Sequence, residues 1–204
     1  MREPLSDILT RLVHDAEEPP RTLNSLLDAA GRQGMNLVIV VLALPFCLPI
    51  LPGVSTPFGF AIILLSAKQL TATGGRLPKF IGDREWSEDT FDRIISGGVR
   101  ILERIDRFSS QGQRRLSKLV RPRLNAFLIL FMGVLMALPI PFPGTNTFPA
   151  WAIVFLATAQ AEQDGILVLW GYASILVTFI WFGVFGTLMW TLTMASYEYL
   201  GGLF

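Results

Sequence analysis

The sequence predicts an all-α polytopic membrane protein with two internal repeats, each a broken or re-entrant helical hairpin, and additional amphipathic interfacial helices. Of its 204 residues, 51% are hydrophobic, which is typical of integral membrane proteins. Three stretches without a charged side chain follow one another, at residues 33–67, 124–161 and 165–197. Each exceeds the ~20 residues that one spanning helix needs, and each contains Pro or Gly near its middle.

Basic residues are confined to the first part of the chain. All 17 Lys and Arg lie within residues 1–123, whereas the remainder carries only Glu162, Asp164 and Glu198 as charged residues. The positive-inside rule therefore predicts a cytoplasmic N-terminus and a cytoplasmic segment at residues 71–123. The N-terminal residues mix acids, bases and prolines, so we expect no cleaved signal peptide.

Residues 1–34 are predicted to form two amphipathic helices. Apolar residues recur at helical spacing from Leu5 onward. Thr22 is the predicted N-cap of the second helix, which the glycines at Gly31 and Gly34 would end. We expect both helices to lie in the headgroup region of the bilayer, with packing on a partner as the alternative.

Residues 35–70 form the first predicted repeat. Its arms, Met35–Leu44 and Phe58–Gln69, have ten and twelve residues and flank a Pro-rich break. At the helical rise they are about 15–18 Å long, roughly half of the ~30 Å hydrocarbon core. Basic residues precede and follow this block, so both ends favour the same side of the membrane. The pattern predicts a re-entrant hairpin, and a transmembrane pair with a tight outer turn is the alternative.

Residues 71–123 are predicted to be a basic, amphipathic, cytoplasmic segment. They carry twelve Lys or Arg and seven acids. Ser87 is a plausible N-cap for a helix whose apolar side chains recur at helical spacing. No stacking aromatics are interleaved with the arginines near Arg123, so we expect attraction to anionic lipid headgroups and no binding of nucleic acid.

Residues 124–161 repeat the first apolar block. When the sequence is shifted by 91 positions, Pro52–Thr56 (PGVST) aligns with Pro143–Thr147 (PGTNT), and Gln69 aligns with Gln160. Each copy has an apolar arm, a Pro-Gly break, a polar pair and a second apolar arm. The sequence therefore predicts a second broken-helix repeat.

Residues 165–204 complete the chain as a C-terminal transmembrane helix or helices. Aromatic residues near the ends suit the membrane interfaces, and the glycines suit close helix packing. The pattern leaves open whether one long tilted helix forms or two short ones broken near Gly183 and Gly186.

The breaks are the candidate binding site. A helix that starts inside the membrane presents unpaired N–H groups and a partial positive charge, which attract anions without a basic side chain. In the first copy Thr56 is a candidate N-cap and Pro57 suits the first helical position. The alternative is that Pro and Gly only kink packed helices. The predicted substrate-binding residues are Pro52, Gly53, Ser55, Thr56, Gly144, Asn146 and Thr147.

No catalytic constellation is visible, so we expect no enzyme activity, no cofactor and no metal site. The chain has one histidine, and its apolar arms contain no charged residue. Glu162 and Asp164 are interpreted as a solvated interfacial turn, with metal binding or proton coupling as the alternative. Because few helices are present to shelter the broken arms, we expect a homo-oligomer surrounded by membrane lipids.

A set of short motifs resembles the exopolysaccharide synthesis ExoD family. The resemblance covers roughly residues 22–185 and implies a small bacterial inner-membrane protein linked to exopolysaccharide production, without assigned catalytic residues. Its motifs are Ala43-Leu44-Pro45, Leu51–Thr56, Gln69, Arg76-Leu77-Pro78, Arg121–Leu124, Leu138–Pro141 and Asp164-Gly165.

A weaker similarity links the two breaks to polyprenyl-phosphate translocases, including the DedA superfamily. It is confined to Pro52–Ser55 and Pro143–Asn146, and the intramembrane acid and arginine found in many of those proteins are missing here. The predicted function is therefore binding or translocation of a small anion, or of an anionic, polyprenyl-phosphate-like lipid headgroup, at the paired helix starts. The alternative is a scaffold or regulator that recruits the polysaccharide machinery through the basic face around Arg100–Arg123.

Overall fold

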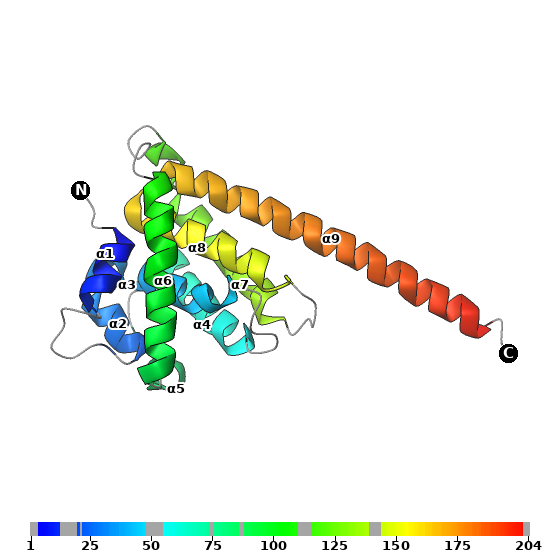
Figure 1. Ribbon diagram of the computed structural model, residues 1–204, viewed down its shortest axis with the longest axis horizontal. Coiled ribbons are helices and arrows are strands. Elements are labelled where there is room, and N and C mark those ends of the chain that lie inside the picture. Colours follow the sequence, from blue (N-terminus) through cyan, green and yellow to red (C-terminus); the bar gives the residue numbers. More distant parts are fainter. Residues whose placement is uncertain are drawn as a thin grey trace.

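The protein is helical throughout the part of the chain that the structure describes. This computed structural model describes residues 4–12, 20, 22–47, 55–73, 76–85, 88–109, 116–138 and 144–201. Every regular element among them is a helix (Figure 1), which confirms the all-α prediction.

Helix α3, Gly34–Ala43, lies at the centre of the fold and continues into a 3-10 turn, Leu44–Phe46. Its side chains from Leu37 to Ala43 are at most 2% exposed. A helix that is apolar on every side is covered either by other helices or by lipid, and α3 is covered by α8, α4, α2 and α6.

Three helices of equal length pack next to one another beside α3, and two of them, α4 and α8, contact it directly. Helices α4 (Ser55–Leu70), α7 (Pro122–Ala137) and α8 (Thr147–Glu162) have 16 residues each. At the helical rise they are about 24 Å long, shorter than the ~30 Å hydrocarbon core. The predicted arm of twelve residues was too short for α4, because the helix includes the polar pair at its start.

Each helix of the first predicted repeat packs on a helix of the second. Helix α4 packs on α7, and α3 packs on α8. Gly59 lies against Ala137, while Gly133 lies against Ile62 and Ile63. Residue numbers rise along α4 as they fall along α7, so the two helices are antiparallel.

The N-terminal helices are packed inside the chain. Helix α1, Leu5–Thr10, contacts α6 and α8, and α2, Leu23–Ala29, contacts α3. Leu5 and Leu9 are completely buried. The apolar faces of these helices are therefore covered within the chain, because α1 packs on α6 and α2 packs on α3. Their position in the headgroup region stays a prediction. The predicted N-cap is confirmed, since Thr22 Oγ1 accepts a hydrogen bond from the Ser25 N–H at 3.1 Å.

Helix α6, Glu88–Ser109, is the amphipathic helix predicted for the basic segment, and it follows the short α5, Lys79–Gly82. Gly98, Leu102 and Ile105 are buried, and α6 packs on α1 and α3. The predicted N-cap, Ser87, lies outside the described residues. The opposite face of α6 is solvent-exposed and carries Arg100, Glu103, Arg104 and Arg107.

The C-terminal segment forms one continuous helix, α9, Gly165–Gly201, of 37 residues. Its first half packs on α8 and its second half extends beyond the other helices (Figure 1). Gly183 and Gly186 do not interrupt it, which settles the question that the sequence left open. Among the described residues, α9 is the helix long and apolar enough to cross a membrane, over Gly165–Ala195.

The close approach of α4 and α7 makes Gly59 a sensitive position. A methyl group there would lie 2.8 Å from the backbone nitrogen of Ala137, so Gly59→Ala should lower the free energy of unfolding by about 1–3 kcal/mol. Thermal unfolding of the purified protein in detergent measures this. Gly97→Ala is the control, because its methyl group would meet nothing within 4 Å and alanine favours helix by about 1 kcal/mol. Equal melting temperatures for the two variants would contradict the packing described.

Candidate functional site

The first predicted site segment begins α4. Ser55 is the first residue of the helix and is 2% exposed, and Thr56 is half-buried. Pro57 is the third residue instead of the first, because the helix begins two residues earlier than predicted. Pro52 and Gly53 lie outside the described residues.

The second predicted site segment begins α8. Gly144 has φ +85°, a left-handed conformation that glycine adopts readily. Asn146 occupies the N-cap position and Thr147 is the first helical residue, but the Asn146 side chain makes no capping hydrogen bond. Its Oδ1 is buried without a hydrogen-bond partner.

Few backbone donors remain free in the first turn of α8. The Phe148 N–H donates to the Gly144 carbonyl at 3.2 Å, and the Ala150 N–H donates to the Asn146 carbonyl at 3.0 Å. Pro149 has no N–H. An anion at this helix start would therefore depend on side-chain donors more than the sequence suggested.

One such donor comes from α9. The indole of Trp181 packs on Phe148, with ring centroids 5.1 Å apart. A methyl group on Gly144 would lie 3.3 Å from Trp181 Nε1, and this nitrogen is buried without a partner. Sequence reasoning missed Trp181 because it assigned the C-terminal aromatics to the membrane interface.

The first turns of α4 and α8 each contact the end of the first helix of the other predicted repeat, which is α7 for α4 and α3 for α8. Gly59 in α4 lies against Ala137, the last residue of α7. Trp151 in α8 donates from Nε1 to the Cys47 carbonyl at 3.1 Å, just beyond the end of the α3 arm. The fold thus brings each start to the opposite repeat.

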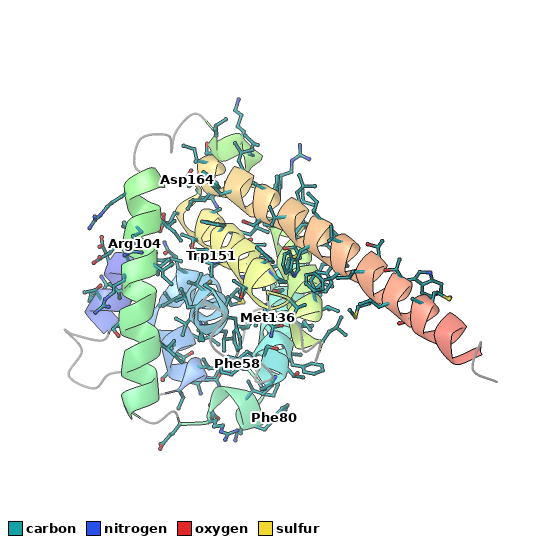
Figure 2. The ribbon with its side chains drawn as sticks, turned by 45° about the vertical axis from the view of Figure 1, so that its right-hand side comes forward. Phe58, Phe80, Arg104, Met136, Trp151 and Asp164 are labelled. Carbon is teal, nitrogen blue, oxygen red and sulfur yellow. The ribbon has the colours of Figure 1, made fainter. Side chains whose placement is uncertain are left out.

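The turn between α8 and α9 is a structural junction. Asp164 lies in this turn (Figure 2), is fully buried, and accepts a hydrogen bond from the Ile166 N–H at 2.7 Å. Glu162 Oε1 accepts one from the Leu5 N–H at 3.0 Å. The interpretation as a solvated turn is therefore wrong for Asp164, because this carboxylate caps the start of α9. Among the described residues, no three His, Cys, Asp or Glu side chains converge as metal ligands.

Comparison with known proteins identifies the family of this chain. The pattern of the family described as "Exopolysaccharide synthesis, ExoD" matches residues 5–184. The chain belongs to the ExoD family.

Two relatives agree with this assignment. The chain is 34% identical to Protein ExoD of Rhizobium meliloti (strain 1021) over 185 residues, which cover 89% of this chain and 77% of that protein. It is also 34% identical to an uncharacterized protein of Synechocystis sp. over 160 residues, covering 73% of this chain and 71% of the relative. No solved structure matches the chain. Membership in the ExoD family links this protein to exopolysaccharide synthesis.

The region matched by the ExoD family contains every site residue discussed above. It includes both helix starts, Trp181 and the Asp164 turn, and it ends before the distal half of α9. Helices α1 to α8 and the first half of α9 are therefore the part of the fold that corresponds to the family.

The role of Asp164 as a helix cap can be tested directly. Asp164→Ala removes the acceptor for the Ile166 N–H and should lower the free energy of unfolding by about 1–2 kcal/mol. Asp164→Asn keeps an acceptor oxygen and should retain most of the stability, as measured by thermal unfolding in detergent. If Asn destabilised the protein as much as Ala, the negative charge itself would be required, and the capping role would be wrong.

Proposed function

We propose that this ExoD-family protein supports exopolysaccharide synthesis by binding or translocating an anionic, polyprenyl-phosphate-like lipid headgroup, or a small anion, within the bacterial inner membrane. The site would lie at the starts of α4 and α8. The protein would span the membrane several times, with its N-terminus and residues 71–123 in the cytoplasm.

Exposed apolar side chains support a membrane location. One face of α7 exposes Phe127, Phe131 and Val134, which are 53%, 37% and 39% exposed. The ring of Phe131 lies 5.8 Å from that of Phe179 on α9, so this face continues onto the exposed side of α9. An apolar surface of this extent is stable when it faces lipid.

The helix arrangement supports a two-fold relation between the repeats. A two-fold rotation that places α3 on α7 and α4 on α8 would also place the α3–α8 contact on the α4–α7 contact. The equivalent residues Gln69 and Gln160 are in contact, because Gln160 Nε2 donates to Gln69 Oε1 at 3.3 Å. Equivalent residues meet each other when they lie near the axis of an isologous arrangement. Because the paired helices are antiparallel, both hairpins would open to the same side, as the basic flanks of the first repeat predict.

The observation that carries the proposed site is a pair of unsatisfied buried atoms at the start of α8. Asn146 Oδ1 and Trp181 Nε1 have no hydrogen-bond partner, and each such buried group costs about 1–3 kcal/mol. A ligand that accepts a hydrogen bond from the indole and donates one to the amide would recover this free energy. A singly protonated phosphate monoester carries both kinds of oxygen, and the positive end of α8 favours its charge.

Self-association is also part of the proposal. The distal half of α9 exposes Val184, Leu188 and Trp190, which are 57%, 47% and 66% exposed. In a membrane these side chains would face lipid or a second copy of the chain. A homo-oligomer would shelter the helix breaks that one copy leaves uncovered.

The transport proposal predicts a specific defect for Trp181→Phe. This change removes the indole N–H but keeps an aromatic ring against Phe148, so it should slow movement of a fluorescent polyprenyl phosphate across reconstituted liposomes about tenfold or more, as loss of a hydrogen bond to a charged group implies. Asn146→Ala should act in the same direction. Trp190→Phe is the control, because Trp190 is exposed on the same helix, and it should leave the rate unchanged. Equal rates for Trp181→Phe and the wild type would contradict the proposed site.

A scaffold or regulator is the second candidate function, favoured by the exposed basic residues of α6 and of the start of α7. In that case the wild-type protein would move neither polyprenyl phosphate nor a small anion. Arg121→Glu with Arg123→Glu would abolish polysaccharide output, because both side chains are exposed and would recruit the polysaccharide machinery by charge. Normal output from this double variant would argue against recruitment through this basic face.

A further inference from the structure

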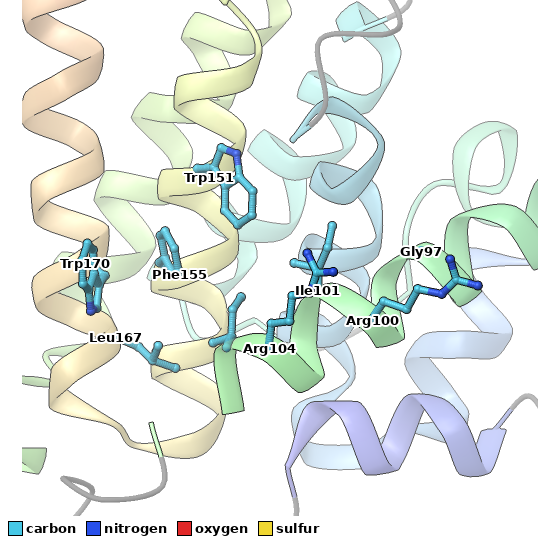
Figure 3. Close-up of a pocket in the computed structure, with 9 residues that line it drawn as sticks. Gly97, Arg100, Ile101, Arg104, Trp151, Phe155, Leu167 and Trp170 are labelled. Atoms are coloured by element: carbon cyan, nitrogen blue, oxygen red, sulfur yellow. The ribbon is translucent and has the colours of Figure 1, made fainter. Parts of the chain in front are cut away.

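A cavity of about 530 Å³ lies between α6, α8 and α9. Its lining includes Trp151, the fifth residue of α8, and otherwise differs from the residues of the helix starts. Figure 3 shows α6 on one side of the cavity and the aromatic residues of α8 and α9 on the other. Trp170 of this cavity and Trp181 of the α8 start are eleven positions apart on α9, or about 16 Å at the helical rise. The cavity is lined by Gly97, Arg100, Ile101, Arg104, Ile105, Trp151, Phe155, Leu167 and Trp170.

The far wall of the cavity is aromatic. Trp151 stacks on Phe155 with ring centroids 5.5 Å apart, and Phe155 lies 6.4 Å from Trp170. The indole N–H of Trp151 is already donated to the Cys47 carbonyl, so its ring acts here as an apolar surface. Trp170 is 55% exposed and ends this row of rings on the outer side of α9.

The near wall carries two arginines. Arg100 and Arg104 are one helical turn apart on α6, and both are exposed. Arg104 lies nearer to Trp151, and Arg100 lies farther along the helix (Figure 3). Neither guanidinium has a hydrogen bond or an ion pair within the part of the chain that the structure describes. Glu103, the acidic neighbour on α6, does not line the cavity.

These two walls suit a ligand with two chemical parts. A guanidinium recognises phosphate oxygens, whereas an aromatic wall stabilises hydrocarbon by removing it from water. A free anion would leave the rings in contact with water, and a hydrocarbon without charge would leave both arginines unused. The row of rings ends at Trp170, from where a chain can pass along the exposed apolar side of α9 into lipid.

We propose that this cavity binds an anionic lipid, with its phosphate at Arg104 and Arg100 and the first part of its hydrocarbon chain along Trp151, Phe155 and Trp170. This site is additional to the helix starts and does not require transport. It places a lipid phosphate on the predicted cytoplasmic side, where α6 covers the helical core.

The ligand chemistry can be tested with farnesyl phosphate and the full-length protein in detergent, using intrinsic tryptophan fluorescence and calorimetry to measure the Kd. Farnesol lacks the phosphate and inorganic phosphate lacks the chain, and each should bind at least tenfold more weakly than farnesyl phosphate. Equal binding of farnesol would overturn the role of the arginines. Equal binding of inorganic phosphate would show a small-anion site and overturn the role of the aromatic wall.

The position of the site can be tested with charge-matched variants. Arg100→Gln with Arg104→Gln should weaken farnesyl phosphate binding at least tenfold. Arg84→Gln with Arg107→Gln removes the same charge from exposed positions that do not line the cavity, and it should leave the Kd unchanged. Equal loss in both double variants would indicate attraction by overall charge and overturn the proposed cavity site.

Filling the cavity offers a test that does not change charge. Gly97→Leu adds bulk at a position where a methyl group would have no neighbour within 4 Å, so it should weaken binding at least threefold while Gly97→Ala binds nearly as the wild type. Melting temperatures equal to or above the wild type would show that both variants fold. Unchanged binding by Gly97→Leu would overturn the location. In calorimetry, Asn146→Ala should weaken only the binding at the start of α8, whereas Arg100→Gln with Arg104→Gln should weaken only the binding at the cavity. Failure of the α8 site and failure of the cavity therefore remain distinguishable.

Discussion

The burial of α3 on all sides is the constraint on which the rest of the structure depends. Its side chains from Leu37 to Ala43 are almost fully buried, and the sequence provides no polar face that could meet water. Helices α4, α8, α2 and α6 cover these apolar sides. The amphipathic helices α2 and α6 bury their apolar faces against α3, and α1 buries its apolar face against α6.

Close packing around α3 depends on small residues at the helix crossings. Gly59 and Gly133 let α4 and α7 approach until side chain meets backbone, which increases the number of dispersion contacts between the two helices. Near the other end of these helices, Gln69 bridges Asn36 and Gln160 through hydrogen bonds of 2.8 and 3.3 Å. Apolar contact and a short polar chain thus join the two predicted repeats at different levels.

The same packing brings polar or charged groups to two places beside α9. At the start of α8 these groups are the Asn146 amide and the Trp181 indole, and at the cavity they are the guanidinium groups of α6. Both places lie where α9 passes over α8, and both combine aromatic surface with polar groups that suit a phosphate. Under the two proposals made above, each place would hold the phosphate of an amphipathic ligand.

Local chemistry explains what the sequence could predict. The Thr22 cap, the amphipathic α6 and the start of α8 next to Asn146 follow from side chains within one or two turns. The resemblance to the ExoD family was likewise visible in short motifs. By contrast, the continuity of α9 through Gly183 and Gly186 could not be read from the chain, because a glycine inside a helix costs only about 1 kcal/mol relative to alanine, which the neighbouring helix-forming residues can outweigh.

Tertiary structure alone decided which distant groups meet. The sequence by itself determined the helical class, the apolar segments and the candidate helix starts, since these depend on composition and local periodicity. It provided no means of placing Trp181 beside Gly144, Arg104 across from Trp151, or Asp164 inside the junction of α8 and α9. Those contacts depend on how helices far apart in the chain pack around α3, and packing is set by the shapes of all the surfaces at once.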